Sequence, residues 1–300
     1  MRALFVLILL TGVILTSGHA PASPLSDISA EEVQTLHTQA AQGIAEAQTN
    51  LGKLYHKGWG VPQDYAKARQ WYEQAAAQGN AKAQFSLGAL YDNGHGVPQD
   101  YKKAAQWYEK AAAQDNADAQ FYLGSLYDNG HGVPQDYAKA RQWWEQAAAQ
   151  GDEWAQFNLG VLYAQGQGVP QDYAKARKWY EQAAARGDEW AQYSLGVLYV
   201  KGLGVPRNYT KAREWFEKAA AQGDVRAQYS LGVLYEKGQG VPQDYARAYM
   251  WWSLAAERWD ASDTSAADAQ DKVARRMTPA QLAKAQRLAS RCQALQFNGC

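Results

Sequence analysis

The eleven residues YDNGHGVPQDY occupy positions 91–101 and return letter for letter at 127–137. The two copies are 36 residues apart, and other positions keep this step along most of the chain. The tyrosine that opens the motif recurs at Tyr55, Tyr91, Tyr127, Tyr163, Tyr199 and Tyr235. A tryptophan recurs in the same way at Trp71, Trp107, Trp143, Trp179, Trp215 and Trp251. A fixed period of this length indicates a repeat protein, in which one small structural unit is copied and stacked.

The pattern predicts that each unit is a pair of helices. In the first unit, the apolar spacing predicts one helix over 45–57 and a second over about 65–78. Gly58 stands where a left-handed C-terminal cap favours glycine, and Asp64 stands where its carboxylate can cap the second helix. Asn208 replaces this aspartate in the fifth unit, and asparagine caps helices equally well. We therefore interpret the aspartate column as helix caps and not as catalytic acids.

The predicted fold is all-α, an α-solenoid of six 36-residue helix-turn-helix repeats with helical caps at both ends. A single helix pair buries too little apolar surface to fold alone, so each unit must pack on its neighbours. The repeats are assigned to 45–80, 81–116, 117–152, 153–188, 189–224 and 225–260. Residues 23–44 are expected to form an N-terminal capping helix, and residues 261–300 a C-terminal helical cap. The last helix should begin at the capping box Thr278-Pro279-Ala280-Gln281.

The first 22 residues have the pattern of a secretory signal peptide. Arg2 precedes a short apolar run from Ala3 to Leu15, and small residues follow. Cleavage is expected after Ala20 or Ala22, with Ala22 favoured because the other site would leave a proline first. The alternative is an uncleaved N-terminal anchor. We expect a periplasmic or secreted protein, with no membrane span after cleavage.

The two cysteines, Cys292 and Cys300, lie in the C-terminal tail. In an exported protein such a pair predicts a disulfide, which would close a small loop at the end of the chain. Free thiols or an intermolecular bridge are the alternatives.

The repeat consensus A-x-A-Q-x-x-L-G-x-L-Y-x-x-G-x-G-V-P-Q-D-Y-x-K-A-x-x-W-Y-x-x-A-A resembles the Sel-one-like repeats, a branch of the tetratricopeptide superfamily. The resemblance covers 45–260. It implies a right-handed superhelix whose first helices line a concave face, and scaffolding or adaptor work, often in bacterial envelopes. Some relatives have a disulfide in each repeat and penicillin-binding or β-lactamase activity. This chain has no cysteine in any repeat, which argues against that activity.

Signals for other chemistry are weak. Lys+Arg and Asp+Glu both number 30, so the chain lacks the basic excess typical of nucleic-acid binding. No serine-hydrolase, zinc-protease or Walker motif occurs, and Gly58-x-Gly60 follows a helix and not a strand. His95 with Asp92, and its copy His131 with Asp128, are the best metal candidates, yet later repeats replace the histidine. We therefore predict no catalytic residue, metal or cofactor.

Columns that vary between repeats are candidates for specificity. By analogy with tetratricopeptide packing, the groove is expected to be lined by positions 46, 49, 53 and 56 of the first repeat and by the equivalent positions of the others. Repeats four and five have mostly apolar residues at these positions. The predicted partner-binding residues are Trp154, Phe157, Val161, Trp190, Tyr193, Val197 and Val200. Trp154 and Trp190 break their column pattern, and either partner contact or packing between repeats would explain them. The invariant Gln48 column is interpreted as buried amides that bond to backbone, with ligand binding as the alternative.

The sequence thus favours a non-catalytic scaffold or adaptor of the bacterial envelope that binds a protein partner in its concave groove. The alternatives are a small-ligand or glycan-binding module and a penicillin-binding or β-lactamase-type enzyme.

Overall fold

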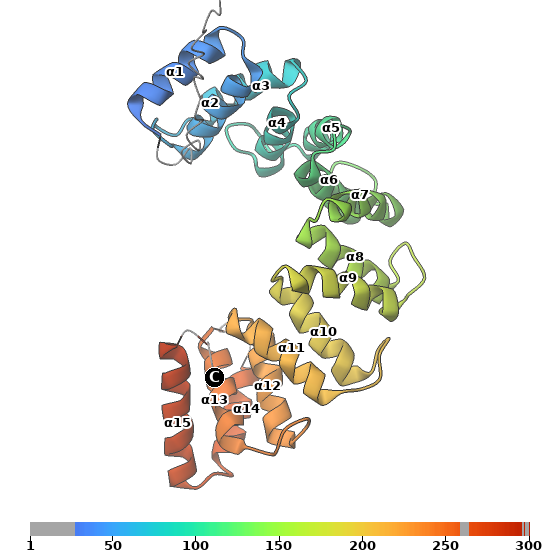
Figure 1. The fold of residues 1–300 in the computed structure, drawn as a ribbon, viewed down its shortest axis with the longest axis vertical. Coiled ribbons are helices and arrows are strands. Elements are labelled where there is room, and N and C mark those ends of the chain that lie inside the picture. The colour runs from blue at the N-terminus through green and yellow to red at the C-terminus, as the bar shows by residue number, and fades with distance from the viewer. Residues whose placement is uncertain (1–27, 259–263, 296, 298–299) are drawn as a thin grey trace, which may run out of the picture. The chain divides into compact units, whose positions relative to one another are not determined.

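A computed structural model describes residues 28–258, 264–295, 297 and 300. The predicted signal peptide, 1–22, lies outside the described residues. The described part contains fifteen helices and no strand, so the all-α repeat fold is confirmed (Figure 1). The helices are α1 (Ala30–Ala41), α2 (Ala45–Lys57), α3 (Tyr65–Ala77), α4 (Ala81–Asn93), α5 (Tyr101–Ala112), α6 (Ala117–Asn129), α7 (Tyr137–Ala149), α8 (Glu153–Gln165), α9 (Tyr173–Ala185), α10 (Glu189–Lys201), α11 (Tyr209–Ala221), α12 (Val225–Lys237), α13 (Tyr245–Arg258), α14 (Ser265–Ala274) and α15 (Pro279–Ala294).

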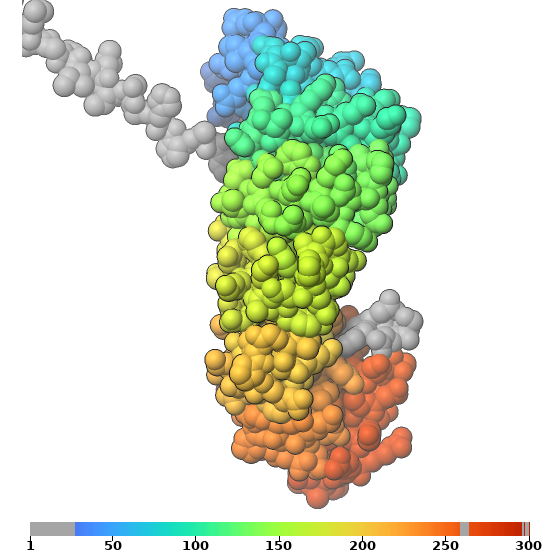
Figure 2. All heavy atoms as spheres, turned by 90° about the vertical axis from the view of Figure 1, so that its right-hand side faces the viewer, coloured from blue at the N-terminus to red at the C-terminus, as the bar shows by residue number. Residues whose placement is uncertain are grey.

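The chain divides into two compact units, one ending at Gln78 and the other starting at Gly79. Unit 1 contains α1, α2 and α3, and α2 packs on both of the others. Unit 2 contains α4 to α15. In unit 2 each first helix packs on the second helix of its own repeat, and α6, α8, α10 and α12 also pack on the second helix of the preceding repeat. Figure 2 shows the successive helix pairs of unit 2 as bands of colour that lie directly on one another.

The turn of the repeated motif is built from hydrogen bonds that use nearly every polar letter. Gly94 is in the left-handed conformation at the end of α4. The Gln99 amide donates to the Asp92 carbonyl oxygen at 2.7 Å and to the Tyr101 hydroxyl at 2.9 Å. The Asp100 carboxylate accepts from the Lys103 N–H at 3.0 Å and caps α5, as predicted. The motif is therefore an architectural turn.

From the third repeat on, the second glycine of the G-x-G brings neighbouring repeats together. Gly204 has φ +65°, which only glycine adopts freely. A Cβ on Gly204 would lie 2.6 Å from the carbonyl carbon of Tyr173 and 2.7 Å from the nitrogen of Ala174. These atoms belong to the start of α9 in the preceding repeat, so the turn of one repeat rests directly on the backbone of another. The same arrangement recurs at Gly240, against Tyr209.

The buried aromatic column is one residue later than the invariant tryptophans suggest. Trp143 is half-buried and packs against the apolar cluster of α5 and α6, whereas the neighbouring Trp144 is only 3% exposed. An invariant tryptophan suggests a buried ring that holds the repeats together, but for Trp143 this expectation is wrong, because Trp144 is the buried ring. The Trp144 ring lies against Gly124 of α6, where a Cβ would be 2.6 Å from the ring, and its indole N–H donates to the Phe121 carbonyl oxygen at 3.0 Å.

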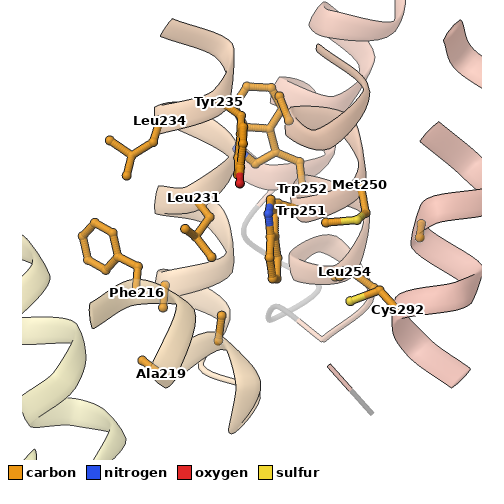
Figure 3. Close-up of a cluster of buried hydrophobic side chains, with 14 of the residues drawn as sticks. Phe216, Ala219, Leu231, Leu234, Tyr235, Met250, Trp251, Trp252, Leu254 and Cys292 are labelled. Atoms are coloured by element: carbon orange, nitrogen blue, oxygen red, sulfur yellow. The ribbon is translucent and has the colours of Figure 1, made fainter. Parts of the chain in front are cut away.

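In the last repeat both aromatic positions are buried, because the C-terminal helices cover α13. Trp251 and Trp252 lie in one cluster with Leu254 of α13 and Cys292 of α15 (Figure 3). The expected capping box is present: the Thr278 hydroxyl accepts from the Gln281 N–H at 3.3 Å, and the Gln281 side chain accepts from the Thr278 N–H at 2.8 Å.

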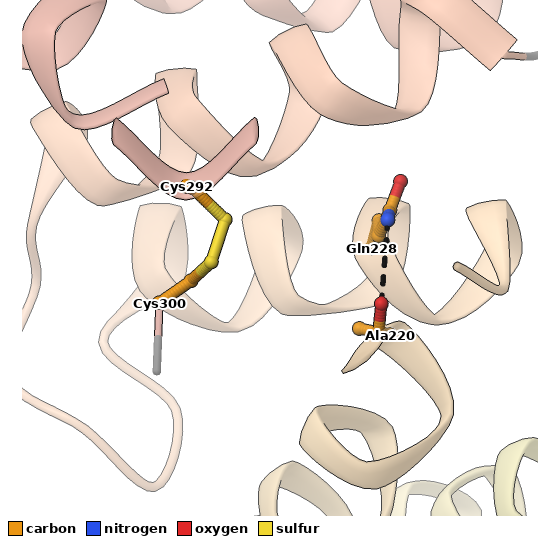
Figure 4. Close-up of a disulfide and its surroundings, with 4 residues drawn as sticks. All are labelled: Ala220, Gln228, Cys292 and Cys300. Carbon is orange, nitrogen blue, oxygen red and sulfur yellow. Dashed lines mark hydrogen bonds between the residues drawn. A yellow bond between two sulfur atoms is a disulfide. The ribbon is translucent and has the colours of Figure 1, made fainter. Parts of the chain in front are cut away.

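Cys292 and Cys300 are joined by a disulfide, with their Cα atoms 5.3 Å apart (Figure 4). The bridge ties Cys300 to the C-terminal end of α15. Cys292 is buried in the cluster that closes the last repeat. The disulfide is thus a terminal clip that adds to the repeat packing and does not replace it.

The invariant glutamines form a ladder of buried amides that bond to backbone, as interpreted from the sequence. The amide nitrogens of Gln120, Gln156 and Gln228 each donate to an alanine carbonyl oxygen eight residues earlier (Figure 4 shows Gln228 with Ala220). In most repeats a second glutamine, at the end of the second helix, donates a hydrogen bond to the side-chain oxygen of the invariant glutamine. These bonds run from Gln78 to Gln48, Gln114 to Gln84, Gln150 to Gln120 and Gln222 to Gln192, at 2.7–3.0 Å.

The ladder is interrupted where arginine replaces the second glutamine. Arg186 and Arg258 stand at these two positions, and the side-chain oxygens of Gln156 and Gln228 then have no hydrogen-bond partner in the part of the chain described. Arg186 instead lies 3.7 Å from the Glu153 carboxylate in an exposed ion pair. A buried acceptor without a partner costs about 1–3 kcal/mol, and an exposed ion pair contributes about 0–1 kcal/mol.

The Arg186→Gln variant is therefore expected to raise the free energy of unfolding by about 1 kcal/mol, because the new amide can donate to Gln156. Urea denaturation followed by far-ultraviolet circular dichroism measures the change. The matched control, Gln150→Arg, removes an existing bond to Gln120 and should destabilise the protein. An Arg186→Gln variant that is less stable than the parent would contradict the interpretation.

Candidate partner-binding surface

The predicted partner-binding residues lie on the first helices of repeats four and five. Phe157 and Val161 on α8, and Tyr193, Val197 and Val200 on α10, are half-buried. Trp154 and Trp190 are 48% and 45% exposed, far more than the other aromatic residues of these helices. The surface formed by α8, α10 and α12 at these positions is called the first-helix face below.

The first-helix face contains a hollow between α10, α11 and α12, with a volume of about 240 Å³. Three of the predicted residues line it, which are Tyr193, Val197 and Val200. The other walls are Phe216, Tyr229, Val233 and Leu234, with Lys201, Ser230 and Gln239 as polar members. The hollow is therefore mostly apolar. Its polar lining residues come from α10 (Lys201), from α12 (Ser230) and from the turn after α12 (Gln239).

The hollow forms at the repeat whose buried aromatic is smallest. The buried aromatic residues of the six repeats are Tyr72, Tyr108, Trp144, Tyr180, Phe216 and Trp252. The Tyr108 hydroxyl donates to the Asp92 carboxylate at 3.1 Å, and the Trp252 indole N–H donates to the Tyr229 carbonyl oxygen at 3.1 Å. Phe216 has no polar group and no second ring to extend in this way. The residue that corresponds to Asp92 is Val200, so the space left by Phe216 has apolar walls.

Trp190 has packing contacts with the repeats on both sides of its own. Its ring makes an edge contact with Phe157 of the preceding repeat, with centroids 6.2 Å apart. The guanidinium of Arg226 lies over it at 4.4 Å and over Tyr193 at 4.6 Å, while Asp224 forms an ion pair with the same guanidinium. Trp190 thus both packs between repeats and presents surface to solvent.

Carboxylates gather at the starts of α8 and α10, beside the two exposed tryptophans. Burial raises the pKa of Asp188, and the nearby carboxylates of Glu189 and Glu153 raise it further. Burial likewise raises the pKa of Asp152, with Glu153 and Asp118 as additional causes. Arg186 is the cation that pairs with Glu153. The start of each helix here therefore has more carboxylates than cations.

Asp152 and Asp188 belong to a cap column that the sequence interpretation missed. The carboxylates accept from the Ala155 and Ala191 N–H groups at 2.7 and 2.6 Å. Asn80, Asn116 and Asp224 cap their first helices in the same way. The sequence signal was an Asn or Asp directly before the first helix of the second to sixth repeats, after the glycine or aspartate that follows the preceding helix.

The metal candidates Asp92 and Asp128 lie in the last turns of α4 and α6, and His95 and His131 lie in the turns that follow. The His131 ring stacks on Tyr101 of the preceding repeat, with centroids 4.7 Å apart. Burial raises the pKa of Asp128. Across the residues that the structure describes, no group of three or more His, Cys, Asp or Glu side chains has a metal-binding arrangement.

Within the described ranges, no helix combines the length and the apolar character needed to cross a membrane.

Six matches to the Sel1 repeat model cover 45–80, 81–116, 117–152, 155–188, 191–224 and 225–258. The chain is a Sel1 repeat protein. Proteins built from Sel1 repeats generally mediate protein–protein interactions, and the family is generally non-enzymatic. No curated protein matches the chain significantly in sequence.

Two solved structures resemble this Sel1 repeat protein over most of its length. One is c5321, a protective antigen of uropathogenic Escherichia coli with an SLR fold, at 36% identity and a TM-score of 0.79. The match covers 86% of this chain but only 56% of c5321. The other is a Sel1 repeat protein from Oxalobacter formigenes, at 36% identity and a TM-score of 0.71, covering 76% of this chain and 94% of the other.

Proposed function

We propose that this Sel1 repeat protein is a non-catalytic scaffold or adaptor that binds a protein partner on the first-helix face. The contact residues would be Trp154, Phe157, Val161, Trp190, Tyr193, Val197 and Val200. The observation that carries the proposal is the apolar hollow of the first-helix face, a face on which two tryptophans are also exposed. Exposed apolar surface with a polar rim is typical of protein contact sites, and tryptophan and tyrosine are enriched where binding energy concentrates.

The size of the hollow favours side chains of a protein over a separate small molecule. Pockets for drug-sized ligands usually measure about 300–1,000 Å³. The hollow, at about 240 Å³, is smaller and lies on an extended helical surface. One or two apolar side chains of a partner would fill it, while the rest of the partner would contact the neighbouring helices.

We further propose that the protein works outside the cytoplasm, in the periplasm or beyond the cell. The disulfide supports this location, because such bonds persist in oxidising compartments. The apolar N-terminal sequence, read as a signal peptide, supports it independently.

The proposal is tested by filling the hollow. Phe216→Trp should leave the fold intact, because Trp144 and Trp252 occupy the same position in other repeats. A partner identified by affinity capture from native envelopes, and then purified, should bind Phe216→Trp at least about tenfold more weakly than the parent, a loss of about 1.4 kcal/mol. Isothermal titration calorimetry measures the affinity.

The control variant is Tyr180→Trp, which makes the same kind of change one repeat earlier. It should affect binding much less than Phe216→Trp. Equal affinity of the partner for the parent and for Phe216→Trp, with normal circular dichroism, would show that the hollow takes no part in binding.

A further inference from the structure

We infer that the partner segment, if the proposed function holds, places a cationic side chain, arginine or lysine, on the face of Trp154. The inference deepens the proposed function by naming the chemistry of the bound segment. It rests on a cation site that the protein already forms one repeat later, and on the charge around Trp154.

The Trp190 site supplies the model for this contact. There Arg226, the second residue of α12, lies over both Trp190 and Tyr193, and the Asp224 carboxylate holds its guanidinium. A cation over an aromatic face is attracted by the negative face of the ring, and a neighbouring carboxylate adds to the attraction. The site is thus an aromatic pair with an acid, completed by a cation from the same chain.

One repeat earlier the same positions hold the aromatic pair and the acid without the cation. Trp154 corresponds to Trp190, Phe157 to Tyr193, and Asp188 to Asp224. The position of Arg226 is taken by Trp190, whose ring contacts Phe157. Trp154 is 48% exposed, and none of the described residues places a cation over its ring.

The charge around Trp154 is complementary to a cation. Asp152, Glu153, Asp188 and Glu189 lie at the starts of α8 and α10, and among the described residues Arg186 is paired with Glu153. Asp152 and Asp188 already accept backbone N–H groups, while Glu189 carries no ion pair among the described residues. An arginine or lysine from outside would gain both the ring and the carboxylates. An acidic segment would be repelled here, which would make the site selective.

The test uses a defined probe, a display library of random ten-residue peptides selected on the full mature chain. Enriched peptides should contain arginine or lysine together with an apolar residue. A synthetic enriched peptide should bind more weakly when citrulline, which is neutral and nearly isosteric, replaces its arginine. It should also bind about tenfold more weakly to Trp154→Leu, which keeps apolar bulk but removes the ring.

Matched variants separate this contact from others. Trp154→Phe should bind the arginine peptide more tightly than Trp154→Leu does, because phenylalanine restores an aromatic face. The citrulline peptide should bind the parent and Trp154→Leu with nearly equal affinity. Binding that is unchanged by citrulline or by Trp154→Leu overturns the inference, and so does enrichment of acidic or uncharged peptides, or no enrichment at all. If enriched peptides that do not depend on Trp154 or on a cation still bind Phe216→Trp more weakly than the parent, the proposed function stands and only the cation site fails.

Discussion

Gly204→Ala is expected to lower the free energy of unfolding by about 2–5 kcal/mol. A left-handed backbone costs a residue with a Cβ about 1–2 kcal/mol, and overpacking adds about 1–3 kcal/mol. Both apply to Gly204, because its φ is +65° and the new methyl group would overlap backbone atoms of Tyr173 and Ala174, which cannot rotate away. Urea denaturation of the full chain, followed by circular dichroism, measures the loss.

Gly187→Ala is the matched control for this prediction. Its φ is also positive, at +103°, but a Cβ there would meet no atom within 4 Å. It should therefore lose only the conformational part, about 1–2 kcal/mol. Equal losses for the two variants would mean that contact between neighbouring repeats adds nothing at Gly204.

Trp144→Ala is expected to destabilise the protein by about 3–5 kcal/mol, because a buried tryptophan leaves both a cavity and a lost transfer energy. Trp143→Ala should cost less, about 1–2 kcal/mol, since its ring is only half-buried. Trp144→Phe should lie between them, because phenylalanine is accepted at the equivalent Phe216 but cannot donate to the Phe121 carbonyl oxygen.

Equilibrium denaturation of the three variants distinguishes the two columns, and hydrogen exchange locates the weakened helices. A larger loss for Trp143→Ala than for Trp144→Ala would reverse the assignment of the buried column.

Much of the fold was predictable because local rules and the repeat period agree. Gly58 and Asp64 could be assigned from single positions, since a left-handed helix end favours glycine and a helix start favours a side-chain acceptor. The 36-residue step then copied each local prediction through the chain. The buried amide ladder also followed, because a glutamine that never changes on an apolar face needs a backbone partner.

Other features depend on contacts between segments and could not be obtained from the pattern. Trp143 and Trp144 are adjacent, and both fit an apolar helix face, so periodicity alone could not tell which ring points into its own repeat. The close approach of Gly204 to Tyr173 depends on how one turn meets another helix. The hollow depends on Phe216 lacking the hydroxyl of tyrosine and the second ring of tryptophan. The sequence shows this substitution, but it does not show the space that the smaller side chain leaves.

The contact of Gly204 with the backbone of α9 has a consequence for how such a chain can grow. Backbone atoms are the same in every copy, so a duplicated segment would join an existing array without needing new side chains at the junction. Gene duplication or deletion of whole 36-residue copies would thus preserve the joint, whereas an insertion inside one turn would misplace it. Surface residues such as Trp154 would then be free to diverge in each copy, which offers a route to new binding partners at little risk to folding.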